Sequence, residues 1–439
     1  MKWSVVFSVF ITLALAGLVV TPVIAYSGDG TYISERVRGM VILGFALLTI
    51  ITTTWVYFVS GARKEKISGL WLTAIVFSAL CLIGIGTIWY MVSHRSPDED
   101  TPASYHMVLN DADVASVREA QISVSQSTNI DPPIFIPTGV FIQSMEFTSA
   151  NNVVITGYIW QRYSNDIPAD ISRGFVMPEG DKIDGTEVYR VKQGNEEVIG
   201  WYIQTTLRQT FDYARYPFDR QDIWLRLWHK DFARNVILVP DFAAYGGNWE
   251  LFNRMGLEQD FVLERLALER TYFNYHFNSY STNFGINNYI GQNNFPELYF
   301  NVGVRREVLD AFVAYLIPMI ILILMAFGVQ FIVTQIAEKM SMYGISTIGL
   351  IGYYASLFFI GILAHLDIRR TLNAPGVVYL EYFYFALYTI LLLQTINSIV
   401  FTVSDKFHFV EYEDNLYPKV IFFPVTLGIM FVVTAIIFF

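Results

Sequence analysis

Seven long apolar stretches and one long polar segment alternate along the chain. A bilayer core about 30 Å thick needs about 20 apolar residues in a helix, and a charge inside that core is costly. Seven stretches reach this length without Asp, Glu, Lys or Arg in their centres. They cover residues 3–26, 40–59, 70–92, 311–334, 344–364, 382–403 and 420–439. The pattern therefore predicts seven transmembrane helices.

The polar segment between the third and fourth spans has a different period. Short runs in which apolar and polar residues alternate, separated by turn residues, predict β-strands. They fall at residues 134–147, 153–163, 201–211, 223–228, 236–239, 272–280 and 298–304. The spacing predicts an antiparallel β-sandwich of about ten strands. The polar stretch before it is predicted to be a linker, although residues 114–124 could form a helix.

These elements define an α plus β membrane protein with four parts. We expect three N-terminal transmembrane helices (1–95), a linker (96–130), an outer β-sandwich (131–308) and a four-helix transmembrane bundle (309–439). The first span could alternatively be a cleaved signal peptide, because Thr21-Pro-Val-Ile-Ala resembles a cleavage region. Its apolar run is long for a signal peptide, so a retained helix is favoured.

Charged loops set the expected orientation. Arg63, Lys64 and Lys66 follow the second span, and the positive-inside rule places this loop in the cytoplasm. The β domain then lies outside. It contains no Asn-x-Ser/Thr sequence, which favours a bacterial inner membrane with a periplasmic domain over a secretory pathway.

Composition narrows the class of protein. The chain is 54% hydrophobic and 15% charged, against roughly 25% charged in soluble proteins. A net charge of −10 argues against a nucleic-acid partner, which needs a basic face. The single cysteine, Cys81, excludes an internal disulfide framework. The six histidines are scattered, and no phosphate loop or Gly-x-Ser-x-Gly elbow occurs. We therefore expect no enzyme activity, no cofactor and no metal.

Several local motifs occur in a recognisable order. They are Tyr216-Pro-Phe-Asp-Arg-Gln221, Arg305-Arg306 about a dozen residues before Pro318, Glu338-Lys339, and Lys419-Val-Ile-Phe-Phe-Pro424. In this order, from a β-sandwich into four helices, the chain resembles the pentameric ligand-gated (Cys-loop-type) ion channels, especially bacterial proton-gated members. The resemblance covers residues from about 134 to 439. The family disulfide is absent, the pore helix looks longer than usual, and the family plan does not explain the three extra helices.

The resemblance implies a coupling region between the outer domain and the pore. By analogy, Asp219 and Arg306 form an ion pair, with Pro217, Phe218 and Asp367 taking part in the same movement. A carboxylate and a guanidinium can form a strong bidentate pair in a partly dry site. The alternative is that both are structural or solvated charges at a domain boundary.

The fifth span is the expected pore helix, at about 338–365. A pore helix needs one face that tolerates water, and small or polar residues at three- and four-residue spacing provide one. Counting from Pro318 along the family pattern selects the same face. It consists of Glu338, Met342, Ser346, Gly349, Tyr353, Ser356 and Ile360. The alternative is ordinary small-residue packing between helices, which also places Gly and Ser on one face. An alternative, more apolar face consists of Ile348, Gly352, Ala355, Phe359 and Ile362.

Three further features bear on ion flow and stimulus. Repeated around a pore, Glu338 would form a carboxylate ring that attracts cations, although Lys339 opposes this. His365 either senses pH or, with Asp367, only marks the water interface. Trp228, Tyr289 and Phe295 are candidates for a cationic ligand, but stray aromatic residues are expected in this composition.

The sequence thus predicts one subunit of a homo-oligomeric, by resemblance pentameric, channel. Its partners would be membrane lipids, permeating small cations and copies of itself, with no nucleic acid. A ligand, ion or proton acting on the outer sandwich would open it. The competing prediction is a non-conducting membrane sensor or scaffold on the same fold.

Overall fold

The chain consists of two compact units. The computed structural model describes residues 67–94, 106–246, 254–263, 265–287, 289, 294–344, 346–403 and 408–439. The helical unit comprises Met1–Arg95, Tyr213–Phe218 and Val308–Phe439, and the β unit comprises Ser96–Asp212 and Asp219–Glu307. The predicted spans at 3–26 and 40–59 lie outside the described residues.

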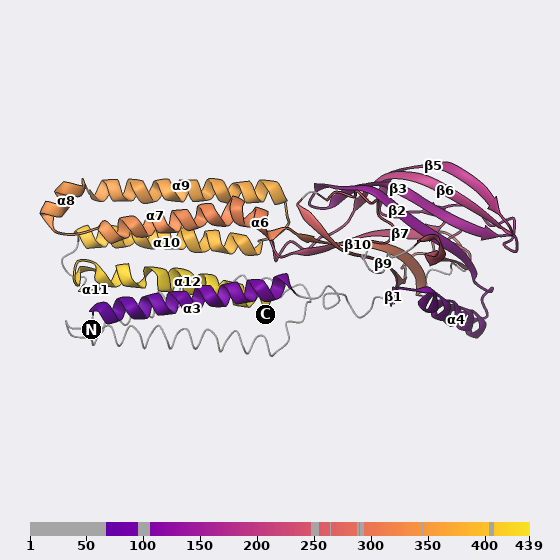
Figure 1. The fold of residues 1–439 in the computed structure, drawn as a ribbon, viewed down its shortest axis with the longest axis horizontal. Helices are drawn as coiled ribbons and strands as arrows, with labels where there is room; N and C mark the ends of the chain where they lie inside the picture. Colours follow the sequence, from indigo (N-terminus) through magenta and orange to yellow (C-terminus); the bar gives the residue numbers. More distant parts are fainter. Residues whose placement is uncertain are drawn as a thin grey trace. The chain divides into compact units, whose positions relative to one another are not determined.

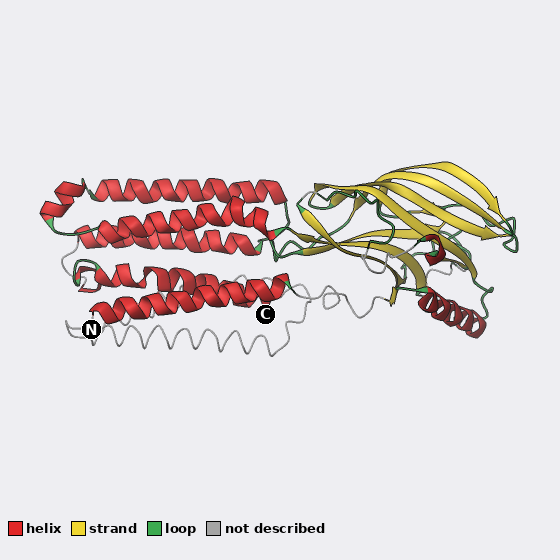
Figure 2. Ribbon diagram, viewed as in Figure 1, coloured by secondary structure: helices red, strands yellow, loops and turns green. Residues whose placement is uncertain are grey.

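Helices of different lengths build the helical unit (Figure 2). Their bounds are α3 Ile67–Ser93, α6 Val308–Ala311, a π-helical turn Phe312–Leu316, α7 Ile317–Ile332, α8 Ala337–Tyr343, α9 Thr347–Leu372, α10 Tyr379–Val403, α11 His408–Glu411 and α12 Leu416–Phe438. Five described segments are long and apolar enough to cross a membrane: α3, α6 to α7, α9, α10 and α12. They match the last five predicted spans, which indicates a multi-pass membrane protein.

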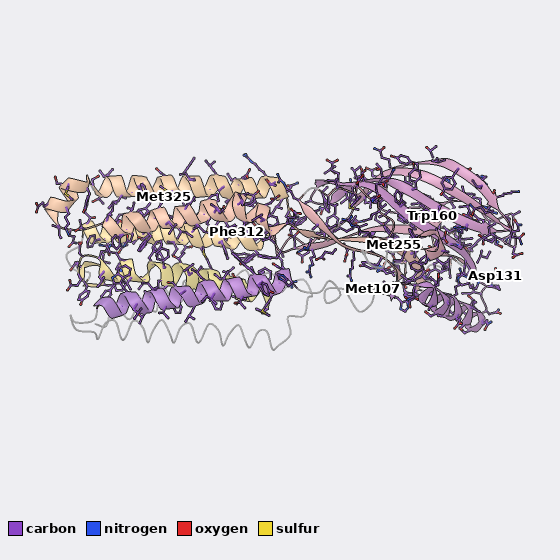
Figure 3. The ribbon with its side chains drawn as sticks, in the orientation of Figure 1. Met107, Asp131, Trp160, Met255, Phe312 and Met325 are labelled. Atoms are coloured by element: carbon purple, nitrogen blue, oxygen red, sulfur yellow. The ribbon has the colours of Figure 1, made fainter. Side chains whose placement is uncertain are left out.

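The long helices lie side by side (Figure 1). Helix α10 contacts α7, α9 and α12, and α3 packs mainly along α12. Helix α9 turns Leu350, Tyr354 and Leu357 into the bundle. Phe312 and Met325, labelled in Figure 3, lie in the π-helical turn and in α7.

The predicted helix at 338–365 consists of two helices in the structure, α8 and α9. Helix α8 ends at Tyr343, and the following Gly344 has a φ of +64°, in the left-handed region that glycine adopts without steric cost. Ser346 then starts α9, since its side chain accepts a hydrogen bond from Gly349 N (3.1 Å) as an N-cap does. Helix α9 also continues to Leu372, because Arg369 and Arg370 suit the negative end of the helix dipole.

Ten described strands form two five-stranded sheets in the β unit (Figure 1). The strands are β1 His106–Val108, β2 Ile134–Ser149, β3 Asn152–Ser164, β4 Phe175–Val176, β5 Gly180–Gln193, β6 Glu196–Arg208, β7 Arg220–His229, β8 Val236–Pro240, β9 Leu266–Asn278 and β10 Phe295–Arg306. One sheet has the order β1-β9-β10-β7-β4 and the other β5-β6-β3-β2-β8. Among these described strands, β2 and β8 alone pair in parallel.

Alternation explains most of these strands. Buried and half-buried residues alternate along β3 and β7, as strands with one face on a core require. The two sheets meet where the Tyr275 hydroxyl of β9 donates to Leu238 O of β8 (2.7 Å). Phe242, in a short 3₁₀ turn after β8, packs on Phe273 of β9. Trp160, labelled in Figure 3, donates from Nε1 to Asp241 Oδ2 (2.8 Å).

The predicted linker contains regular structure. Strand β1 pairs with β9, and α4 spans Asp111–Thr128 with Asn110 as its N-cap, so residues 114–124, which could form a helix by sequence, lie within one. The seven predicted strands correspond to β2, β3, β6, β7, β8, β9 and β10. The pattern missed β5, whose charged sequence pairs only with β6 at a sheet edge.

Candidate functional site

Asp219 and Arg306 form an ion pair in the β unit. Arg306 Nε donates to Oδ1 (2.8 Å) and Oδ2 (3.0 Å) of Asp219, so one nitrogen spans both carboxylate oxygens. The Asp219 side chain is 1% exposed and that of Arg306 20%. Strands β7 and β10 bring them together, because Arg220 pairs with Arg305 in an antiparallel register. The next positions outward are then Asp219 and Arg306.

The pair joins points where the chain passes between the two units. Gln221 Nε2 donates to Asp219 Oδ2 (2.9 Å) and to Asp212 O (2.7 Å). Asp212 is the last residue before the chain enters the helical unit, Asp219 is the first after it returns, and Arg306 lies two residues before the next passage. A charge-assisted hydrogen bond is stronger than a neutral one, so this cluster holds three chain passages together.

The segment between those passages, Tyr213–Phe218, belongs to the helical unit; we call it the base loop. Ala214 O accepts a hydrogen bond from Tyr379 N (2.8 Å). The Phe218 ring lies 5.7 Å from Trp89, 6.3 Å from Tyr379 and 5.6 Å from Phe438, measured between centroids. The Tyr216–Pro217 peptide bond is cis. Pro217 and Phe218 thus lie among the ends of α3, α10 and α12.

A second charged cluster lies at the start of α10 and was missed by the sequence. Glu381 is fully buried. His365 Nε2 lies 2.8 Å from its Oε1, Arg369 forms an ion pair with the same oxygen, and Val378 N donates to Oε2 (2.8 Å). Glu381 directly precedes the predicted span at 382–403, a position where a charge usually faces water. The available signal was His365 and Arg369, four residues apart on one helix face.

Asp367 does not share this burial. It is exposed on α9, two residues beyond His365. Near the end of α9, His365 is thus partly buried against Glu381 and Asp367 faces away from it. The sequence grouped these two residues together.

The predicted pore residues fall on two helices. Glu338 and Met342 are exposed on α8. Ser346 caps α9, Tyr353 is half-buried, and the remaining predicted positions, Gly349, Ser356 and Ile360, are exposed on α9. The alternative face is also uncovered by the described residues of this chain, with Ile348 85% and Phe359 65% exposed. The described residues of this chain thus leave most of both faces exposed.

Aromatic side chains gather at one end of β7. Trp228 lies 5.6 Å from Tyr280 and 5.6 Å from Phe232, and Phe232 lies 6.0 Å from Tyr289. Phe284 contacts each of these four rings. We call these five residues the aromatic cluster. Two of the three predicted ligand residues, Trp228 and Tyr289, belong to this cluster. The third, Phe295, does not, because it begins β10 opposite Asn278.

Arg226 sets the charge beside the aromatic cluster. Its guanidinium carbon lies 5.3 Å from the Trp228 ring centre, a cation–π contact. It pairs with Glu179 and with Glu297 (3.4 Å), and the Tyr280 hydroxyl donates to Glu297 Oε1 (2.6 Å). Burial raises the pKa of Glu179 despite the neighbouring Arg226. Two carboxyl groups thus share one guanidinium, an arrangement that favours cations.

Neither a protein-family model nor a curated protein matches this chain. Within the described residues, no three or more His, Cys, Asp or Glu side chains gather where a metal ion could be held. The site must therefore be interpreted from its own geometry.

Proposed function

We propose that the chain is one subunit of a homopentameric, cation-selective channel of the ligand-gated type, in a bacterial inner membrane with the β unit outside. One observation carries this proposal. The base loop leaves the β unit and packs within the helical unit, and Asp219 and Arg306 pair directly at its end. Such a connection can convert a change in the β unit into a movement of helices.

The stimulus acts on the β unit in this proposal. The aromatic cluster and the carboxyl groups of Glu179 and Glu297 suit a cationic ligand, which would compete with Arg226 for the ring of Trp228. Displacing Arg226 would alter β7, the strand that begins at Arg220 directly after Asp219. The base loop then moves with Phe218.

Ion flow in this proposal follows α9. Five copies of α9 surround the axis, and the exposed Glu338 of α8 lies at one mouth. A ring of carboxylates concentrates cations and repels anions. The predicted face with Ser356 tolerates water better than the alternative face with Ile348 and Phe359.

Planar-bilayer recording of the purified full-length chain tests the proposal. With a KCl gradient, we expect a current whose reversal potential lies near that for K⁺. Glu338→Gln should shift this potential towards zero, whereas Lys339→Gln, its neighbour on α8, should not shift it in that direction. Absence of current across a screen of pH, calcium and cationic amines would contradict the proposal.

A non-conducting membrane sensor or scaffold is the second candidate. The uncovered apolar residues of α9, Ile348, Phe359 and Leu363, favour it, because an apolar helix face can pack against other helices as well as line a dry constriction. A density map of the purified oligomer separates the two functions. A continuous water path along the axis supports the channel, and a filled axis supports the scaffold.

A further inference from the structure

Helix α3 has no counterpart in the channel family that the chain resembles, yet it fits closely against the bundle. Its buried residues recur every three or four positions, at Ala74, Ser78, Cys81, Ile85 and Ile88. This spacing marks one helix face, and α3 contacts α12 extensively. A Cβ atom added at Gly84 would lie 2.5 Å from a ring carbon of Phe431 in α12, which is too close for a side chain. The small residue at 84 therefore permits close contact between the two helices.

This contact brings Trp89, near the end of α3, to the base loop. The Trp89 and Phe218 rings lie 5.7 Å apart. Trp89 Nε1 donates to the Tyr379 hydroxyl (2.8 Å), Tyr379 is hydrogen-bonded to the Thr434 hydroxyl (2.8 Å), and Thr434 donates to Met430 O (2.7 Å). Since Thr434 donates to Met430, Tyr379 donates to Thr434. The chain of donors runs in one direction from α3 through α10 to α12.

Tyr379 has three roles at this point. Its backbone N donates to Ala214 O of the base loop, its ring packs against Phe218, and its hydroxyl accepts from Trp89. Phe438 closes the other side, 4.9 Å from Tyr379 and 5.6 Å from Phe218. Trp89 therefore acts on the loop twice, by direct ring contact with Phe218 and by orienting Tyr379.

We propose that α3 is a working part of the gating apparatus, with Trp89 as a positioning residue that holds the base loop ready to transmit movement. The claim that α3 controls opening depends on the proposed function, but the claim that Trp89 orders the base loop does not. Without Trp89 the loop is less ordered, and movement of the β unit is transmitted less completely. Loss of Trp89 therefore makes opening harder.

Hydrogen exchange of the full-length protein in detergent micelles tests the ordering. The amides of Tyr216 and Phe218 donate within the base loop, to Tyr213 O and Arg215 O. A ring contact between aromatic groups contributes about 0.5–1.5 kcal/mol, or roughly a twofold to tenfold change in an equilibrium constant. We expect Trp89→Ala to speed exchange in the base loop about tenfold and Trp89→Phe, which keeps a ring, to speed it less.

Trp71→Ala is the matched control. Trp71 lies near the start of the same helix, whereas Trp89 lies near its end. The Trp71 ring contacts Phe331, with ring centroids 6.4 Å apart. We expect base-loop exchange in Trp71→Ala to equal that of the wild type, while global melting temperatures of the two variants stay similar. Equal exchange in Trp89→Ala and wild type, or equal acceleration by both alanine variants, would overturn the proposal. If Trp89→Ala does not fold, Trp89→Phe and Tyr379→Phe give the same comparison.

Recordings in bilayers test the effect on opening. Trp89→Ala should require about tenfold more of the activating stimulus, and Trp71→Ala should match the wild type. A wild type without current would contradict the proposed channel function and leave the exchange comparison to decide the ordering role of Trp89. A conducting wild type with equal activation in all variants would overturn the role of α3 in opening.

Discussion

The two ends of the helical unit are held together in different ways. At one end, which we call the loop end, side chains bind side chains: Trp89 binds Tyr379, and His365 and Arg369 bind Glu381. At the opposite end, the side-chain hydrogen bonds of Lys419 and Gln335 end on backbone carbonyls, and Lys419 Nζ also lies 3.9 Å from Asp414 Oδ2. Lys419 Nζ donates to Val333 O and Asp414 O (both 2.8 Å), and Gln335 Nε2 donates to Phe401 O (2.7 Å).

This difference separates two mechanical roles. The last carbonyls of a helix lack partners within it, so Lys419 and Gln335 satisfy helix ends. Beneath them, Val333, Leu350, Phe401 and Val410 form an apolar cluster. At the loop end, contacts between side chains connect α3, α9, α10, α12 and the base loop. We therefore expect a change in one element there to alter several others, and we expect the opposite end to move less.

The largest expected effect comes from removing the carboxylate at the loop end. Glu381→Ala removes a buried carboxylate that binds His365, Arg369 and Val378 N, and a hydrogen bond to a charged group contributes about 1.5–3 kcal/mol. At the opposite end, Gln335→Met removes one neutral hydrogen bond to Phe401 O (2.7 Å), worth about 1 kcal/mol. Thermal unfolding in detergent should show a clearly larger loss for Glu381→Ala. Equal losses would remove the distinction between the two ends.

The ion pair at the edge of the β unit comes next. A double-mutant cycle of Asp219→Asn and Arg306→Gln should give a coupling free energy of about 2–3 kcal/mol, since interacting residues reach such values. Arg234 and Asp170 pair at the same distance, 2.8 Å, but are 44% and 68% exposed. Exposed pairs contribute about 0–1 kcal/mol. Similar coupling in both cycles would show that burial does not strengthen the Asp219 pair.

Acid should weaken the β unit through His229. Burial lowers the pKa of His229 from 6.5 to about 4, and its Nε2 has no hydrogen-bond partner among the described residues. The unfolded chain then binds more protons between these values, so stability is full above about pH 6.5 and falls towards pH 4. The loss is up to roughly 3 kcal/mol. His229→Gln should flatten this part of the stability–pH curve; an unchanged slope would exclude His229 as its source.

The smallest effect concerns the start of α9. Ser346→Ala removes the N-cap hydroxyl that accepts from Gly349 N and should cost about 1 kcal/mol. Amide exchange should increase only in the first turn of α9. Ser356→Ala is the control, because Ser356 donates to Gly352 O within the helix and caps no helix end. Unchanged exchange in Ser346→Ala would indicate that α9 does not begin at Ser346 and that the helix is continuous from α8.

The sequence predicted those elements whose residue pattern is set mainly by burial of apolar side chains. The described transmembrane helices followed from apolar length, and β3 and β7 from alternation. Glu381 and Arg369 were missed because a charge at a helix end looks exposed in sequence, whereas here each charge partners another. Strand β5 was missed because pairing with β6, rather than burial, holds its charged residues in place.

The candidate site was only partly predictable for a similar reason. Resemblance suggested Asp219 and Arg306, but their contact depends on the register between β7 and β10, which the sequence does not specify. Trp89 had no motif at all. Its role follows from the packing of α3 on α12, a long-range contact that local patterns cannot reveal.

Bilayer current with a matched pair of phenylalanine variants tests the central claim most directly. Phe218 lies at the loop end, and Phe331, which contacts Trp71 and Phe327, lies at the opposite end. We predict that the wild type conducts cations, that Phe218→Ala needs at least about tenfold more stimulus to open, and that Phe331→Ala opens like the wild type. A silent wild type, or equal shifts in both variants, would contradict the account.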